Sequence, residues 1–152
     1  MSFVLILLSF FGMEFMAWFT HKYVMHGIMW FWHSDHHRKD HESWFERNDI
    51  FFIIYATPGI VCIISGITAG FSPLFYIGIG ITLYGFTYFM VHDIFIHQRF
   101  KLFRDAKLPY LIAIRKAHKA HHKVLTKEQG TCFGMLLVPK KYYLEAQKIL
   151  SR

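Results

Sequence analysis

Cysteine and acidic residues are scarce in this chain, and the first shortage excludes a class of site. The 152 residues include two cysteines, Cys62 and Cys132, which form no CxxC pair. They cannot hold an iron–sulfur cluster by themselves, so electrons for any redox chemistry must come from a separate carrier. Asp and Glu number ten against 17 Lys and Arg, and Glu14 is the only acid within a long apolar run.

Charge is nearly absent from three apolar runs, and 54% of the whole chain is hydrophobic. The runs are about 17 to 20 residues long and cover residues 3–19, 50–69 and 73–91. A helix needs about 20 residues to cross a bilayer core of about 30 Å. The sequence therefore predicts an all-α integral membrane protein with three to four transmembrane helices, formed as a single domain over residues 1–152. Residues 132–138 are too short to cross and either dock against the membrane or cover the site.

Lys and Arg are missing from the first run and from the turn at residues 70–73. All 17 lie within residues 22–47 or 99–152. Basic segments beside transmembrane helices stay in the cytoplasm, so we expect both on the cytoplasmic face of the inner (cell) membrane. There they contact anionic membrane lipids. Because these residues flank membrane spans and form no separate soluble face, we expect no nucleic acid partner.

No histidine lies within the apolar runs. All eleven occur at residues 21–41 or 92–122. Ten of them form two HxxxxH and two HxxHH motifs: His21, His26, His33, His36, His37, His92, His97, His118, His121 and His122. These ten are candidate metal ligands, and the lone His41 is left out. The topology puts every histidine on the cytoplasmic face, on extensions of the membrane helices.

The spacing within the motifs predicts how they lie on helices. The three histidines of HxxHH share one face of an α-helix, because residues three and four apart are neighbours. We therefore expect three imidazoles to converge. The two histidines of HxxxxH would lie about 140° apart around a regular α-helix. We expect the helix to end or distort there, which Gly27, directly after His26, would permit.

Imidazole suits iron, zinc, copper and nickel, so the ligands alone do not identify the metal. A single tetrahedral or 2-His-1-carboxylate site uses about two to four protein ligands, so ten histidines are enough for two ions and leave some to hydrogen-bond the ligands instead of the metal. Carboxylates can also accept the outer N–H of an imidazole and fix its orientation. The candidates for this role are Glu14, Asp35 and Asp93. Alternatively, Glu14 bonds a hydroxyl on a neighbouring helix and the two aspartates lie solvated in loops.

The motifs, in this order, resemble those of the bacterial beta-carotene hydroxylases, which belong to a histidine-motif membrane di-iron group with the fatty acid and sterol hydroxylases. The likeness covers nearly the whole chain, from Gly12-Met-Glu14 to Cys132-Phe-Gly134. Between these ends it includes the histidine motifs, Asn48-Asp49, Gln98-Arg99 and Lys127-Glu128. One departure is Asp93-Ile-Phe-Ile, where that family often carries a glycine after the aspartate.

This resemblance implies an enzyme that uses O2 and two iron ions bound by the ten motif histidines. The implied substrate is beta-carotene, hydroxylated at C3 of each beta-ionone ring to give beta-cryptoxanthin and then zeaxanthin. One oxygen atom enters the product and the other forms water, so each turnover consumes two electrons and two protons. The resemblance also implies ferredoxin and its reductase as the electron source.

Other functions remain open on the residues alone. A fatty acid or sterol hydroxylase, a carotenoid ketolase or a lipid desaturase would use similar histidines. A non-catalytic metal carrier should place polar ligands near the bilayer midplane, whereas the apolar runs of this chain hold no histidine. A haem protein needs paired axial histidines on facing helices, which the HxxHH spacing does not favour.

Overall fold

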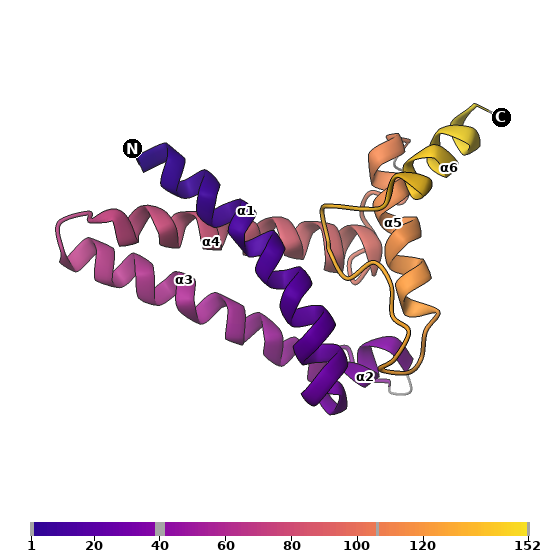
Figure 1. Cartoon of the computed structure of the whole chain (residues 1–152), viewed down its shortest axis with the longest axis horizontal. Helices are drawn as coiled ribbons and strands as arrows, with labels where there is room; N and C mark the ends of the chain where they lie inside the picture. The colour runs from indigo at the N-terminus through magenta and orange to yellow at the C-terminus, as the bar shows by residue number, and fades with distance from the viewer. Residues whose placement is uncertain (1, 39–41, 106, 152) are drawn as a thin grey trace.

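The computed structural model describes residues 2–38, 42–105 and 107–151, and these contain helices and loops without a strand. In chain order the elements are α1 (Ser2–Thr20), η1 (His21–Ile28), α2 (Trp30–Arg38), η2 (Arg47–Asp49), α3 (Ile50–Thr68), α4 (Pro73–Phe89), η3 (Met90–Ile96), α5 (Pro109–His122) and α6 (Lys140–Leu150). The expected all-α class is confirmed. Figure 1 shows α1, α3 and α4 in the elongated part of the molecule and α2, α5 and α6 at its other end.

Three helical stretches are long and apolar enough to cross a membrane: Ser2–Ile28, Arg47–Thr68 and Pro73–Ile96. Few residues of these stretches are buried within the protein. In the most apolar window of each stretch, 11% of the residues are buried in the first and 17% in each of the other two. Apolar surface of this extent is stable only against another apolar phase. The described chain is therefore a membrane protein with three spans, the lower end of the expected range.

Helix α4 packs against both α1 and α3. Two of its glycines make these contacts close. A Cβ on Gly78 would lie 2.8 Å from the backbone nitrogen of Ile63 in α3, and a Cβ on Gly80 would overlap Ser9 in α1. Small residues let membrane helices approach until their backbones touch. The two glycines thus hold the three spans in one bundle.

The turn between α3 and α4 also depends on glycine. Gly70 has a φ of 72°, a left-handed conformation that residues with a Cβ rarely adopt. Gly66 lies directly against the backbone of Phe75, where a Cβ has no room. The hairpin therefore closes tightly at the end of the bundle away from the histidines.

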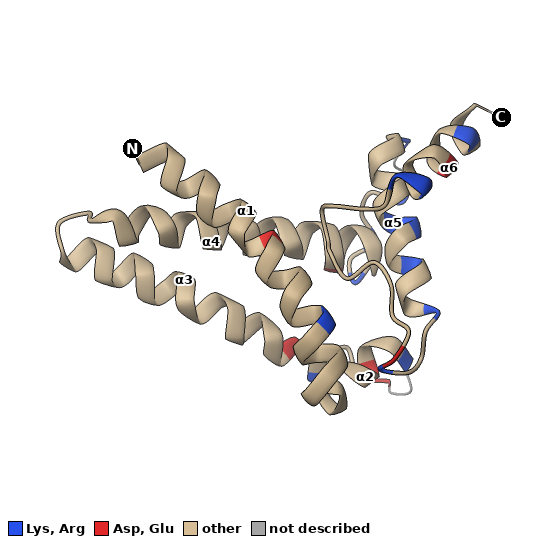
Figure 2. Ribbon diagram, viewed as in Figure 1, with Lys and Arg blue, Asp and Glu red and all other residues tan. Residues whose placement is uncertain are grey.

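Charged residues gather at the end of the molecule that carries α2, α5 and α6, and the hairpin end of α3 and α4 carries none (Figure 2). At the charged end, α5 packs on α6 through Ala113, Ala117, Tyr142 and Ala146. The segment that joins these two helices, residues 123–139, has no helix of its own and is called the strap below. In Figure 1 it runs from the α2 side of the molecule back to α6.

Candidate metal centre

Both HxxxxH motifs lie where an α-helix changes into a π-helix. His21 and His26 belong to η1, whereas His92 lies in η3 and His97 directly follows that helix. In a π-helix each N–H bonds the carbonyl five residues earlier, as the His97 N–H does with the His92 carbonyl at 2.9 Å. This wider turn brings histidines five apart to one side. Gly27 leaves the helical conformation with φ −111° and ψ −112°, so the expected distortion is confirmed.

The ten motif histidines converge in two adjoining groups. Group 1 consists of His21, His26, His33, His37 and His121. Group 2 consists of His36, His97, His118 and His122. Within each of these sets, one ring nitrogen per residue lies within 4.8 Å of the others. His92 is counted with group 2, because its Nε2 lies 3.1 Å from the Nε2 of His36. His41 lies outside the described residues.

Each HxxHH motif is divided between the two groups. His33 and His37 lie in group 1, whereas His36 lies in group 2. The expected convergence of all three rings is wrong, because consecutive residues of an α-helix point about 100° apart, and this turns His36 away from His37. The second motif, at residues 118–122, repeats the arrangement with the groups exchanged. Each group therefore combines one HxxxxH pair, the outer histidines of one HxxHH motif and the middle histidine of the other.

Neutral oxygens orient all five imidazoles of group 1. The Nδ1–H of His33 donates to the side-chain amide oxygen of Asn48 at 2.6 Å. The other four Nδ1–H groups donate to backbone carbonyls: His21 to Phe133 (2.9 Å), His26 to Lys127 (3.2 Å), His37 to Val124 (2.9 Å) and His121 to Thr131 (2.7 Å). Four of these acceptors are backbone carbonyls of the strap. A carbonyl only accepts, so each Nδ1 carries the proton and each Nε2 keeps a lone pair. The Cys132 backbone, between two of these carbonyls, has a φ of 59°.

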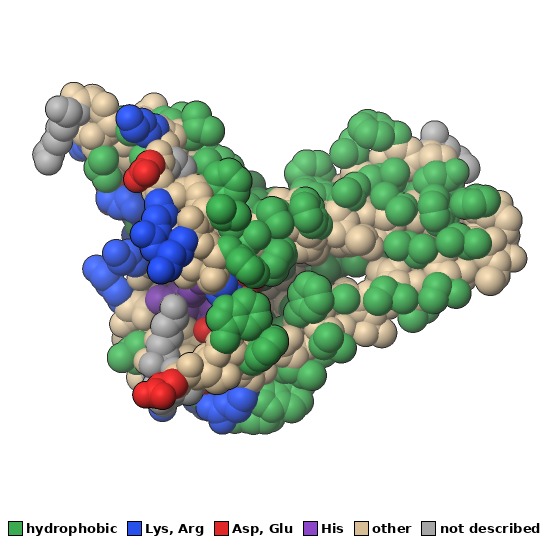
Figure 3. Space-filling model, turned by 180° about the vertical axis from the view of Figure 1, so that it is seen from behind, with side chains coloured by type: hydrophobic (Ala, Val, Ile, Leu, Met, Phe, Trp, Pro, Cys, Tyr) green, Lys and Arg blue, Asp and Glu red, His purple; other side chains and the backbone are tan. Residues whose placement is uncertain are grey.

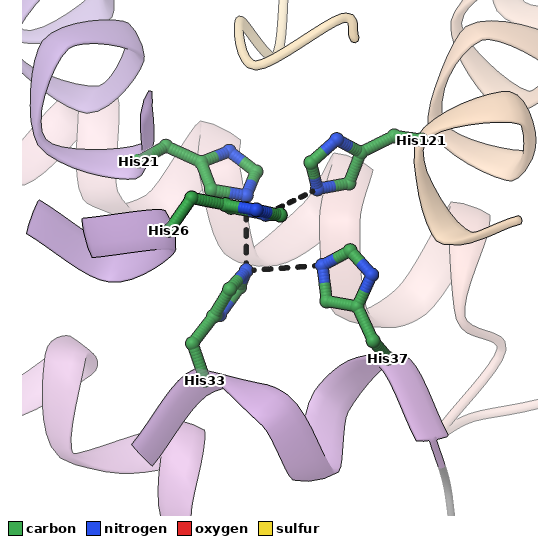
Figure 4. A group of neighbouring side chains, drawn as sticks. All are labelled: His21, His26, His33, His37 and His121. Carbon is green, nitrogen blue, oxygen red and sulfur yellow. Dashed lines mark hydrogen bonds between the residues drawn. The ribbon is translucent and has the colours of Figure 1, made fainter. Parts of the chain in front are cut away.

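The Nε2 atoms of group 1 face one another at short range (Figure 4). The separations are 3.1 Å for His21–His33, 3.2 Å for His33–His37 and 3.3 Å for His26–His121. Lone pairs at this distance repel unless a cation lies between them. Two imidazole nitrogens bound to one ion at about 2.1 Å lie about 3.0–3.4 Å apart for bond angles of about 90–109°. The donor set of group 1 therefore fits a metal ion.

Carboxylates orient two imidazoles of group 2. Nδ1–H of His36 donates to Glu46 at 2.5 Å, and Nδ1–H of His92 donates to Asp93 at 3.2 Å. The Nε2 atoms of His97 and His118 lie 2.9 Å apart, as close as the pairs of group 1. Nε2 of His122 is buried without a hydrogen-bond partner. A metal ion would satisfy this nitrogen, so group 2 fits one as well.

One arginine holds the carboxylates behind group 2. The Arg99 guanidinium contacts Glu46 at 3.3 Å, Asp49 at 2.7 Å and Asp93 at 3.2 Å. Asp49 also accepts the backbone N–H of Glu46 at 3.0 Å. Three carboxylates thus share one guanidinium.

Burial favours the neutral form of imidazoles in both histidine groups. It lowers the pKa of His33 and of His122 to about 2, of His121 to about 3 and of His37 to about 4. Burial also lowers the pKa values of His36 and His118 well below the usual range, and neighbouring imidazoles add to this effect. Only the neutral ring offers a lone pair to a metal, so the site is prepared for binding at neutral pH.

Of the three candidate carboxylates, Asp93 contacts a motif histidine. Glu14 is buried in α1 and accepts four hydrogen bonds: from the Tyr84 hydroxyl at 2.7 Å and from the backbone N–H groups of Met135, Leu136 and Leu137 at 2.9–3.0 Å. Glu14 therefore bonds a hydroxyl on a neighbouring helix, as the second of the two expectations for it stated, and does not orient a histidine. It also anchors the strap. Asp35 is buried and accepts the backbone N–H of Arg47 at 2.5 Å, so it is not a solvated loop residue.

Several residues of the site were not singled out by sequence reasoning. They are Glu46, Asn48, Arg99 and the backbone of the strap. Asn48 and Arg99 belong to segments of the family resemblance, which was the available signal. For the short apolar segment at residues 132–138 we expected either docking against the membrane or a cover over the site, and the structure shows the cover.

Group 2 lies beside a cleft. The cleft has a volume of about 290 Å³ and is lined by His37, Ile96, His97, Arg115, His118, Lys119 and His122. All five members of group 1 are buried, whereas His97 and His122 of group 2 are half-buried. Figure 3 shows histidine surface among Lys and Arg side chains on one face, and hydrophobic side chains over the elongated part. The lining of this cleft thus combines histidines of both groups with two basic residues, Arg115 and Lys119.

The chain is similar to known proteins over most of its length. The model of the fatty acid hydroxylase family matches residues 6–139. The chain is 41% identical to a beta-carotene hydroxylase of Pseudescherichia vulneris, over 94% of this chain and 80% of that protein. It is 42% identical to a beta-carotene hydroxylase of Pantoea ananas, over 89% and 76% of the two chains. It is 39% identical to beta-carotene 3-hydroxylase 2 of Arabidopsis thaliana, over 86% of this chain and 43% of that longer protein. No solved structure matches.

Proposed function

The chain belongs to the fatty acid hydroxylase family, and from this premise we propose that it is a carotenoid hydroxylase that converts beta-carotene to beta-cryptoxanthin and then zeaxanthin. The observation that carries the proposal is the convergence of imidazole Nε2 atoms in two groups, in a chain about 40% identical to proteins named beta-carotene hydroxylase. The net reaction inserts one atom of O2 into a C–H bond at C3 of each ring. The other atom forms water with two electrons and two protons.

The ten motif histidines would hold two iron ions, one in each group. Bound iron would supply the O2 chemistry that an unactivated C–H bond requires. The chain's own residues place an oxygen acceptor beside the Nδ1 atoms of all five imidazoles of group 1 and of His36 and His92 in group 2, and bring Nε2 atoms together in each group. This arrangement buries the five rings of group 1 and fixes the ligand geometry before a metal binds.

Access from the bilayer supports an apolar substrate. The spans expose apolar side chains along their length, and two of them continue into the π-helices that carry histidines. A carotenoid dissolved in the bilayer therefore meets the histidine groups at the membrane face without entering water. A soluble polar substrate would make no use of this exposed apolar surface.

The location of the site and its electron source belong to the same proposal. The concentration of Lys and Arg at the histidine end favours the cytoplasmic face of the inner membrane. Arg115 and Lys119 line the cleft beside group 2, and positive charge at this point favours an acidic electron carrier such as ferredoxin, which a reductase would supply.

Expression in a bacterium that accumulates beta-carotene tests the function. We expect pigments heavier by one and by two oxygen atoms that coelute with beta-cryptoxanthin and zeaxanthin. The His121→Ala variant should form neither product, whereas His41→Ala, outside the motifs, should form both. Unchanged beta-carotene with an iron-loaded protein in the membrane would contradict the substrate and favour a lipid or sterol.

A further inference from the structure

The two histidine groups have the same set of imidazoles but differ in the oxygen atoms that accept their Nδ1 protons. Each contains an HxxxxH pair, the outer histidines of one HxxHH motif and the middle histidine of the other. All five Nδ1 atoms of group 1 donate to uncharged oxygens. In group 2, His36 and His92 donate to the carboxylates of Glu46 and Asp93.

We propose that the two metal positions are chemically distinct, and that Glu46 and Asp93 are positioning residues that strengthen metal binding in group 2 alone. The proposal rests on the proposed function in one respect, namely that both groups hold a metal. It goes further by assigning each ion a different environment and by naming the residues that cause the difference.

Hydrogen bonding to a carboxylate changes an imidazole more than hydrogen bonding to a carbonyl does. The negative charge draws the Nδ1 proton and makes Nε2 a more basic ligand. The hydrogen bond from His36 to Glu46, at 2.5 Å, joins an N–H to a carboxylate, and hydrogen bonds to an ionised acceptor are stronger than those to a neutral one. The negative charge of the carboxylate also attracts a nearby divalent metal ion, and a neutral carbonyl attracts that ion far less.

The surrounding charges confine this effect to one side. Arg99 binds Glu46, Asp49 and Asp93 together, so these carboxylates are held beside group 2. The acceptors behind group 1 come from the strap backbone and from Asn48. His33 and His36 lie on the same helix, α2, yet one donates to an amide and the other to a carboxylate.

This pair of acceptors offers matched substitutions that change charge and leave shape nearly constant. Glu46→Gln removes the carboxylate that accepts the Nδ1–H of His36 in group 2. Asn48→Asp adds a carboxylate behind group 1, where His33 already donates to the Asn48 side-chain oxygen at 2.6 Å. Asp93→Asn is a second variant for group 2, should Glu46→Gln fail to fold.

The test uses purified full-length protein in detergent, freed of metal and titrated anaerobically with ⁵⁷Fe²⁺. Mössbauer spectra of the loaded protein should show two components of equal area. Glu46→Gln and Asp93→Asn should each change the same component and weaken binding of that ion about 10- to 100-fold. Asn48→Asp should change the other component and tighten the other ion.

Two results would overturn the inference. If Glu46→Gln alters both components equally, or if Asn48→Asp alters the same component as Glu46→Gln, the carboxylates do not distinguish the positions, although the chain still binds two ions. If the wild-type chain binds fewer than two ions, the metal content in the proposed function fails together with this inference.

Discussion

Replacing Glu14 with leucine should detach the strap from the membrane helices. In the wild-type protein, four donors converge on this one carboxylate: three consecutive N–H groups of the strap and the Tyr84 hydroxyl of α4. Leucine fills similar space without an acceptor, so the donors lose their partner inside an apolar bundle. The strap carries the carbonyls that orient four imidazoles of group 1, so its displacement should also disturb the metal site.

The magnitude follows from the burial of these donors. The Met135 N–H and the Tyr84 hydroxyl form buried hydrogen bonds with Glu14, and each costs about 1–3 kcal/mol when left unpaired. The N–H groups of Leu136 and Leu137 form part-buried bonds and add less, because water can reach them. Together we expect a loss of about 3–5 kcal/mol, which lowers the melting temperature of a chain of this size by about 6–20 °C.

The assay compares the melting temperature and iron content of Glu14→Leu, Tyr84→Phe and wild-type protein in the same detergent. Tyr84→Phe is the control, because it removes one donor from Glu14 and leaves the strap contacts in place. It should cost about 1–2 kcal/mol and keep full iron. A Glu14→Leu protein that melts with the wild type and binds the same iron would refute the anchoring role.

Three further outcomes follow from the packing and the burial of the site. Gly130→Ala should lower the affinity for iron, as measured by iron titration. The added Cβ would lie 2.6 Å from the Phe133 ring, and that ring packs against imidazoles of group 1. Gly66→Ala should destabilise the protein by about 1–3 kcal/mol while preserving iron, because its Cβ would overlap the Phe75 backbone far from the site; thermal melting measures this. The metal-free protein should lose stability as the pH falls below about 6.5, because the unfolded chain then gains protons that buried imidazoles such as His33, with a pKa near 2, do not take up. The loss should approach about 1.4 kcal/mol per pH unit for each such histidine, and a melting temperature that is flat between pH 7 and 5 would contradict it.

The spans and the location of the histidines could be predicted because their signals are local. Apolar runs of the right length predict membrane helices wherever the helices later pack. The spacing of five in HxxxxH conflicts with an α-helix, and this conflict predicted that the helix ends or distorts there; the structure shows the distortion to be π-helices at His21–Ile28 and Met90–Ile96. These features depend on neighbours in the chain.

The turn of about 100° between His36 and His37 follows from helix geometry, but the group that each ring joins could not be predicted, because that depends on how two distant helices face each other. Helical spacing places His33, His36 and His37 on one broad face, but α5 meets that face so that the rings separate into two groups. The strap was hidden for a different reason. Its ligand-orienting groups are backbone carbonyls, which every residue has, so no residue type marks them.

The partners of the acidic residues show the same limit. Asp93 is adjacent in sequence to His92 and contacts it, whereas Glu46 reaches His36 only because residues 42–49 fold back over α2. Asp35 is surrounded by motif histidines in the sequence, yet its carboxylate binds the backbone of Arg47. Sequence proximity therefore identified one acceptor and missed the one with the shortest contact.

The number of iron ions per chain tests the central claim most directly. Purified protein is reconstituted anaerobically with ferrous iron, freed of unbound metal and measured for iron and protein. The two histidine groups predict two ions per chain, and His33→Ala and His118→Ala, one from each group, should each bind fewer. A wild-type chain that holds one ion or none, while folded in detergent, would contradict the account.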